Sequence, residues 1–303
     1  MKKLKNAVKQ LVNQLPYVKT LYKQAANCTH PNGHYYSPVF SIADVKSRQD
    51  SIWKDVNKDG IANIDLRTNE QKQLMERLSS YYDALPFKAE KTSQFRYEFN
   101  NSYFSYSDGI LLYAMIREFQ PKRIIEIGSG HSSALMLDAN ELFFRNEIEL
   151  TFIEPYPDER LNWLMNAEDK KRHTIIPNFV QSVSLDVFSQ LEAGDILFID
   201  STHVSKTGSD VNYILFDVLP VLQPGVLIHF HDVFYPFEYP KEWVFHGYNW
   251  NEDYLLRAFL MCNTAYDILL FPDYLHLHHK EAFDQMPLCR LKTGGSFWIQ
   301  KKQ

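Results

Sequence analysis

The stretch Glu126-Ile-Gly-Ser-Gly130 constrains the fold of this chain more than any other segment. It follows the apolar run Arg123-Ile-Ile, so it predicts a strand that ends in a glycine-rich turn and leads into a helix. Glycine at such a turn lets the backbone approach a ligand closely, because it has no Cβ and tolerates positive φ. The next apolar run ends in Glu154, where an acidic residue can accept hydrogen bonds from both hydroxyls of a ribose. Together they predict a nucleoside-containing ligand at the edge of an α/β sheet.

The spacing of the glycines distinguishes between classes of nucleoside ligand. The dinucleotide fingerprint requires a third glycine where this chain has Ser133, and no Gly-Lys-Ser/Thr follows as it would in a phosphate-binding loop. Glu126 would repel a pyrophosphate, but it suits a cationic ligand such as S-adenosylmethionine. The alternative is a plain strand–helix turn with an incidental glutamate.

Composition restricts the class of protein further. The hydrophobic content of 45% excludes disorder for most of the chain, and a net charge of −5 gives no argument for binding nucleic acid. The three cysteines form no Cys-x-x-Cys pair, so neither a disulfide framework nor a zinc knuckle is indicated. No apolar run reaches the ~18 residues that a membrane span requires. We therefore expect a cytoplasmic protein.

Residues 1–99 are expected to form an N-terminal helical cap that includes an aromatic loop. Residues 1–24 carry lysines but no acidic residue, and their apolar residues have helical spacing up to Pro16, which predicts a basic amphipathic helix. Such a helix can pack on its own domain or on a second copy in a homo-oligomer, which we favour, or it can lie on an anionic membrane surface. Residues 66–85 again show helical periodicity.

Residues 100–303 are expected to form a second domain, because predicted strands and helices alternate there. We expect strands at 123–127, 149–154, 173–176, 195–200 and 225–230, and helices at 107–119, 132–144, 158–167, 184–192 and 209–222. Ser107-Asp108 is the expected N-cap of the first of these helices. This alternation predicts an α/β fold with a doubly wound, mainly parallel, Rossmann-like sheet. Two further strands, 266–271 and 295–300, have no long helix between them and predict an antiparallel hairpin at the edge of the sheet.

Polar side chains follow the two strands that should end at the ligand-binding edge of the sheet. Asp200 and His203 follow one strand, and His231 and Asp232 follow the next. Carboxylates and imidazoles that converge suit a divalent metal and a general base. His229 and His231 share one face of a strand, so they could form an iron triad with Asp200, although we favour His229 as an interior histidine. His231 is open between a metal ligand and a hydrogen-bonding neighbour, and both aspartates could instead cap turns.

Four segments carry a resemblance to a known family. They are Ile125-Glu-Ile-Gly-Ser-Gly-His-Ser-Ser133, Phe152-Ile-Glu-Pro155, Asp195-Ile-Leu-Phe-Ile-Asp-Ser-Thr-His203 and Gly225-Val-Leu-Ile-His-Phe-His-Asp232. Over roughly residues 100–303 the chain resembles the class I S-adenosylmethionine-dependent methyltransferases. Within that family it is similar to the bacterial branch related to macrolide-sugar O-methyltransferases and, more distantly, to catechol O-methyltransferase.

The resemblance implies a role for each residue of the site. It implies that the glycine turn, with Glu126, Gly128, Gly130 and Ser132, holds the methionine part of S-adenosylmethionine. An acid, here Glu154, would hold the ribose. A polar residue, here Gln181 or Ser182, would lie by the adenine. It also implies a metal ligand at Asp200 and a base at His203. The family's other two ligands are consecutive acid or amide residues, so His231-Asp232 departs from the pattern at one position.

These implications lead us to expect methyl transfer to a hydroxyl of a sugar, a glycan or another small molecule. A divalent metal on Asp200, His231 and Asp232, with magnesium as the first expectation and manganese or iron as alternatives, would lower the pKa of that hydroxyl. His203 would then take the proton.

Aromatic residues that can stack on sugar faces are candidates for the wall of the acceptor pocket. They are His34, Tyr35 and Tyr36, with the segment 248–254. Three other classes stay open at this point: an iron-dependent hydroxylase on the same scaffold, a nicotinamide-dependent oxidoreductase, and a non-catalytic binding protein.

Overall fold

The computed structural model describes residues 5, 11–12, 15–18, 20–21, 28–54 and 60–302. The basic helix expected over residues 1–24 therefore lies mostly outside the described residues. Within the described residues, no helix combines the length and the apolar character that crossing a membrane requires.

Contacts between residues divide the described chain into two compact units. The smaller unit contains the described residues up to 54 together with residues 240–249, and the larger one contains residues 60–239 and 250–302. The boundary expected between residues 99 and 100 falls inside the larger unit. The division into a helical cap and a methyltransferase domain stays a prediction.

The described residues of the smaller unit include the short helices α3 (Ile42–Ser47), α4 (Gln49–Ile52) and α13 (Lys241–Phe245). Ser41 begins α3, because its hydroxyl accepts a hydrogen bond from the Asp44 backbone N–H. The Trp53 and Phe245 rings pack edge to face at 5.8 Å. In the aromatic loop, the rings of Tyr35 and Tyr36 lie 4.3 Å apart and are exposed.

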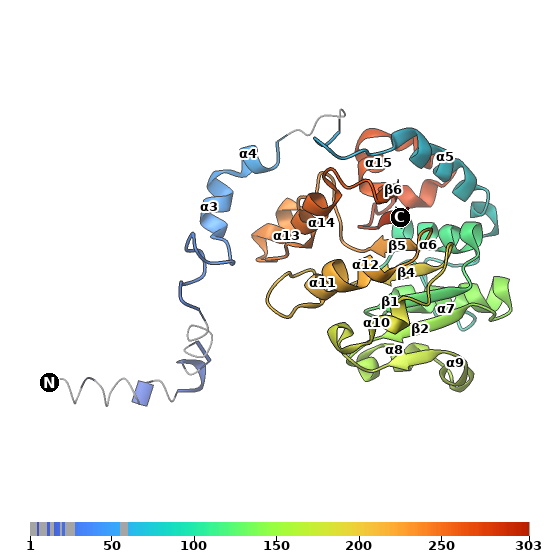
Figure 1. The fold of residues 1–303 in the computed structure, drawn as a ribbon, viewed down its shortest axis with the longest axis horizontal. Coiled ribbons are helices and arrows are strands. Elements are labelled where there is room, and N and C mark those ends of the chain that lie inside the picture. Colours follow the sequence, from blue (N-terminus) through green and yellow to red (C-terminus); the bar gives the residue numbers. More distant parts are fainter. Residues whose placement is uncertain are drawn as a thin grey trace. The chain divides into compact units, whose positions relative to one another are not determined.

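The larger unit is built on a seven-stranded sheet with the order β3-β2-β1-β4-β5-β7-β6 (Figure 1). Its strands are β1 (Arg123–Ile127), β2 (Glu149–Ile153), β3 (Thr174–Ile176), β4 (Ile196–Ile199), β5 (Leu227–Phe230), β6 (Tyr266–Leu270) and β7 (Phe297–Lys301). The first five strands pair in parallel, and β7 pairs antiparallel with both β5 and β6. The predicted Rossmann-like sheet is thereby confirmed.

The pattern of burial explains why these segments form strands. Every residue of β4 and β5 is buried, as expected for central strands that helices cover on both faces. The antiparallel pairing of β6 with β7 is confirmed, but β7 lies inside the sheet and β6 forms the edge. Residues 271–296 join these two strands, so the connection is far longer than a tight hairpin turn.

The helices of the larger unit follow the predicted alternation with shorter elements in places. They are α5 (Thr68–Ser79), α6 (Tyr106–Phe119), α7 (His131–Phe144), α8 (Leu161–Leu164), α9 (Ala167–Arg172), α10 (Leu185–Phe188), α11 (Asp210–Tyr213), α12 (Leu219–Val221), α14 (Glu252–Leu260) and α15 (Pro272–His278). The 3₁₀ turns are η1 (Tyr82–Ala84), η2 (Pro157–Glu159), η3 (Val180–Ser182), η5 (Lys280–Phe283) and η6 (Pro287–Arg290), and a π-helical segment, η4 (Ile214–Val218), joins α11 to α12.

One local expectation is wrong. Ser107 and Asp108 do not cap α6, because the helix already begins at Tyr106. Asp108 is buried, and one of its carboxylate oxygens accepts hydrogen bonds from the backbone N–H groups of Gly295 and Ser296 at 3.1 and 3.0 Å. This carboxylate therefore ties α6 to the start of β7.

Candidate functional site

Four predicted site residues follow directly after neighbouring strands of the sheet. The parallel ladder continues one residue beyond each strand: the backbone N–H groups of Glu154, Gly128, Asp200 and His231 donate to carbonyl oxygens at the end of the adjacent strand. The donor–acceptor distances lie between 2.9 and 3.1 Å. The sheet thus places these four residues in a row along its carboxyl edge, where ligands of doubly wound folds bind.

The glycine turn requires glycine at position 128 for two reasons. Gly128 has a φ of +79°, which side chains other than glycine rarely adopt. A Cβ at this position would also lie 2.1 Å from the backbone oxygen of Asp200. The turn after β1 and the end of β4 therefore approach each other more closely than any other residue would allow.

Glu126 is held inside the turn. Its carboxyl group is completely buried and accepts hydrogen bonds from the hydroxyls of Ser132 and Ser133 in the first turn of α7. Burial raises the pKa of Glu126 to about 8, although the two hydroxyls lower it in part. Glu126 and Ser132 thus join the turn to the helix that follows it.

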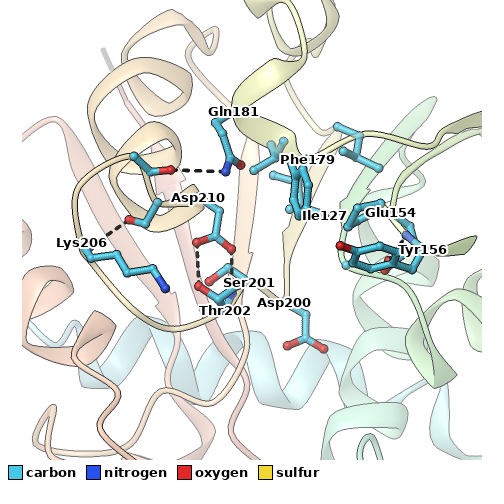
Figure 2. A pocket seen from close by; sticks show the side chains of 16 residues that line it. Ile127, Glu154, Tyr156, Phe179, Gln181, Asp200, Ser201, Thr202, Lys206 and Asp210 are labelled. Atoms are coloured by element: carbon cyan, nitrogen blue, oxygen red, sulfur yellow. Dashed lines mark hydrogen bonds between the residues drawn. The ribbon is translucent and has the colours of Figure 1, made fainter. Parts of the chain in front are cut away.

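A pocket of about 430 Å³ opens beside this turn (Figure 2). Gly128, Glu154, Gln181 and Asp200 line it, together with other residues that the sequence did not indicate; these are Ile127, Ile153, Pro155, Tyr156, Phe179, Val180, Ser201, Thr202, Lys206, Gly208, Ser209 and Asp210. Figure 2 shows Glu154 and Tyr156 on one side of this pocket and Lys206 and Asp210 on the other. The Glu154 carboxylate accepts hydrogen bonds from the backbone N–H groups of Ser129 and Tyr156 at 3.1 and 2.8 Å, which fix its orientation.

The other predicted cofactor residues lie in β1, in the glycine turn, in α7 and in η3. Glu126, Gly130, Ser132 and Ser182 belong to the described chain but do not line this pocket. Ser182 lies in η3 next to Gln181, whose side-chain amide donates a hydrogen bond to the Gly208 carbonyl.

Beside the pocket, His203 lies between carboxylates. Its Nε2 atom is 3.4 Å from Asp200 Oδ1 and 3.7 Å from Asp232 Oδ2, while its Nδ1 atom is 2.9 Å from Glu252 Oε2. His231 is also close to both aspartates, with Nδ1 3.7 Å from Asp200 Oδ1 and 3.5 Å from Asp232 Oδ1. The structure therefore brings together His203, Asp200, His231 and Asp232.

Contacts within this cluster shift the pKa values of His203 and Asp200. Burial alone would lower the pKa of His203, but its contacts with Asp200 and Glu252 outweigh burial and raise it to about 10. Burial alone would raise the pKa of Asp200, but the imidazoles of His231 and His203 lower it to about 2. Asp200 therefore favours its carboxylate form and His203 its imidazolium form.

His229 differs from the other two histidines. It is completely buried, its ring stacks on Phe198 at 3.9 Å, and its Nε2 lies 3.2 Å from Ser296 Oγ. Burial lowers the pKa of His229 well below its usual value. These contacts are those of a neutral histidine inside the helix–sheet layer.

The described residues contain no preformed metal site. Among residues 28–54 and 60–302, no group of three or more His, Cys, Asp or Glu side chains is placed so that it could hold a metal ion. A divalent metal on Asp200, His231 and Asp232 stays a prediction.

Sequence reasoning missed two buried carboxylates of this site. Glu252 contacts His203, and Asp108 Oδ2 lies 3.7 Å from His231 Nε2. Glu252 lies within the segment 248–254, whose aromatic residues alone drew attention to it, and the position of Asp108 suggested only a helix cap. Both partners are distant in sequence, so no local signal connects these residues to the site.

Comparison with known proteins places the chain in a family. The family described as "Methyltransferase domain" matches residues 125–233, which contain the glycine turn, Glu154, Asp200 and Asp232. The chain belongs to the methyltransferase family. An uncharacterized protein of Archaeoglobus fulgidus is 36% identical to this methyltransferase over 183 residues, which cover 58% of this chain and 80% of that protein.

Two methyltransferases of known structure are similar to this methyltransferase at a low level. One is the S-adenosylhomocysteine-bound methyltransferase PaMTH1 of Podospora anserina. Its superposition includes 87% of this chain and 97% of PaMTH1, with 17% sequence identity and a TM-score of 0.40. The O-methyltransferase TomG of Streptomyces achromogenes covers 86% and 96% at 13% identity and a TM-score of 0.40. These similarities are too weak to carry an argument about function.

Proposed function

We propose that this methyltransferase transfers a methyl group from S-adenosylmethionine to a hydroxyl of a sugar or another small molecule, with His203 as the general base. One observation carries the proposal. Asp200 lines the pocket that Glu154 and Gly128 also line, and its Oδ1 atom lies 3.4 Å from His203 Nε2. A candidate cofactor pocket and a candidate base therefore meet at one carboxylate.

The lining of the pocket supports a positively charged nucleoside cofactor. A volume of about 430 Å³ is within the usual range for small-molecule sites. Ile153 and Val180 offer apolar surface to an adenine, Glu154 offers acceptors to ribose hydroxyls, and Asp200 offers negative charge near a sulfonium. When bound there, S-adenosylmethionine would supply an electrophilic methyl group.

His203 would supply the proton transfer. A hydroxyl is a good nucleophile only as its proton leaves, and a neutral imidazole within hydrogen-bonding distance can accept that proton. Holding the hydroxyl in line with the methyl group would supply much of the remaining acceleration. Because the neighbouring carboxylates raise the pKa of His203, the transfer rate should rise with pH as the imidazole loses its proton.

Radiolabelled S-adenosylmethionine and a panel of sugars, glycans and phenols test this proposal. His203→Ala should lower the single-turnover rate on the order of 10²–10⁴-fold, the usual contribution of a positioned acid–base group. The affinity for S-adenosylmethionine should change little, because His203 is not among the residues that line the pocket within the described chain. A variant that keeps the wild-type rate, with the same decrease at low pH, would refute the base assignment.

A further inference from the structure

Asn251 and the first residues of α14 contact the two loops that carry His203 and Asp232. The backbone N–H groups of Asn251 and Glu252 donate to the His203 carbonyl at 3.0 and 3.2 Å. Asp253 Oδ2 accepts a hydrogen bond at 3.2 Å from the backbone N–H of Phe234, in the loop that follows β5 and contains Asp232. One helix end therefore ties the loop after β4 to the loop after β5.

Glu252 makes the most direct of these contacts. Its Oε2 atom lies 2.9 Å from His203 Nδ1, and the hydroxyl of Ser201 donates to both carboxylate oxygens at 3.2 and 3.3 Å. The side chains of Glu252 and His203 are only 2% and 6% exposed. A buried carboxylate is costly without partners, so these contacts hold Glu252 against this one loop.

The hydrogen bond that one imidazole nitrogen makes determines whether the other nitrogen carries a proton and in which direction it points. With Nδ1 directed at Glu252, Nε2 faces Asp200 and Asp232 at the edge of the cofactor pocket. The backbone of His203 has a φ of +59°, which is uncommon for a residue other than glycine. Such a conformation persists only when the surroundings enforce it, and the Trp250 ring, 4.4 Å from the imidazole, adds to that enforcement.

We infer that Glu252 is a positioning residue for methyl transfer: it holds His203 through Nδ1 so that Nε2 is presented to the acceptor hydroxyl. The inference rests on the proposed role of His203 as the base. Glu252 itself lies behind the imidazole and does not touch the reacting atoms. Its contribution is to keep the imidazole in one orientation when the acceptor binds.

Kinetics and a direct view of the imidazole test this inference together. We compare Glu252→Ala and the isosteric Glu252→Gln with a control variant, Glu238→Gln. Glu238 accepts a hydrogen bond from Tyr254, which lies on α14 like Glu252. Rates are measured per folded molecule. Proton–nitrogen correlation spectra of protein labelled with ¹⁵N-histidine follow the ring of His203, whose signals are assigned by their loss in His203→Asn.

Glu252→Ala should lower kcat on the order of 10- to 100-fold, the range found when a group that orients a metal-binding histidine through its other ring nitrogen is removed. The KM for S-adenosylmethionine should stay unchanged, and the His203 Nδ1 signal should shift. Glu252→Gln keeps an oxygen that can accept a hydrogen bond, so it should restore part of the rate, and Glu238→Gln should leave both the rate and the spectrum unchanged.

Two outcomes separate the inference from the proposed function. If His203→Ala abolishes transfer while Glu252→Ala keeps the wild-type rate and the wild-type ring signals, the inference is overturned and the base assignment stands. If neither variant slows transfer, the base assignment itself is wrong. A loss of folded protein with full turnover in the remaining molecules would show that Glu252 only stabilises the fold, and would likewise overturn the inference.

Discussion

Replacing Arg96 with alanine should lower the free energy of unfolding of the larger unit by more than the loss of an exposed ion pair would. The Arg96 side chain is 15% exposed, and its guanidinium lies 2.7 Å from Asp138 Oδ1 on α7. The guanidinium also binds both carboxylate oxygens of Asp169 on α9, at 3.1 and 2.9 Å. Asp138 and Asp169 are only 2% and 4% exposed. Arg96→Ala therefore leaves two buried carboxylates without their cation.

The magnitude follows from what each carboxylate retains. Removing one partner of a buried ion pair costs roughly 3–5 kcal/mol, because the remaining charge stays buried. Asp138 still accepts from the backbone N–H groups of Arg96 and Tyr97, and Asp169 still accepts from that of Asn166. These remaining bonds reduce the cost, so we expect a loss near the lower end of the range, about 3 kcal/mol.

Urea denaturation followed by circular dichroism measures this loss as a lower midpoint with an unchanged slope. Lys171→Ala is the matched control, because Lys171 pairs with Glu168 on the same helix as Asp169 while both side chains are largely exposed. That variant should change the midpoint little. Arg96→Met combined with Asp138→Asn and Asp169→Asn should recover most of the stability. A loss below about 1 kcal/mol in Arg96→Ala would refute the reasoning.

Three further predictions concern the cofactor turn and the metal. The pKa of Glu126 is about 8 in the folded state and near 4.5 in the unfolded chain, so the free energy of unfolding should fall as pH rises across that interval. Glu126→Gln should flatten the decline of Tm with pH. An unchanged slope would contradict the raised pKa of Glu126. Glu154→Ala should weaken S-adenosylmethionine binding by about 1.5–3 kcal/mol in calorimetry, and an unchanged Kd would remove its ribose role. Chelation should abolish turnover if a divalent metal acts on Asp200 and Asp232, and full activity after chelation would end the metal prediction.

The central sheet could be predicted from the sequence, because each strand is a short apolar run bounded by polar or turn residues. The apolar run predicts strand β1 over residues 123–127, and the structure has it there. The helix predicted over 158–167 is instead η2 and α8, because Met165 is extended and Asn166 starts α9 by accepting hydrogen bonds from the N–H groups of Glu168 and Asp169. The Asp169 side chain in turn accepts a hydrogen bond from the Asn166 backbone N–H, which completes a capping box. The sequence contains this local signal for the start of α9.

The position of β7 and the partners of His203 are not local properties. A strand can pair with any neighbour that offers a compatible edge, so its apolar pattern does not determine that β7 lies between β5 and β6. Likewise, the contact between His203 and Glu252 depends on how α14 meets the sheet. The sequence indicated Asp200 and His203 because they follow a strand directly, whereas the residues that orient them come from elsewhere in the chain.

The insertion of β7 between β5 and β6 has a consequence for synthesis on the ribosome. Residues 297–301 are translated after every other described strand, yet both of the neighbouring strands pair with them. Until they emerge, β5 has one unpaired edge, and Asp108 lacks its donors at Gly295 and Ser296. The nascent protein can thus complete its glycine turn long before the half of the site that contains His231 and Asp232. That half of the sheet edge is complete only once residues 297–301 have emerged and paired with β5.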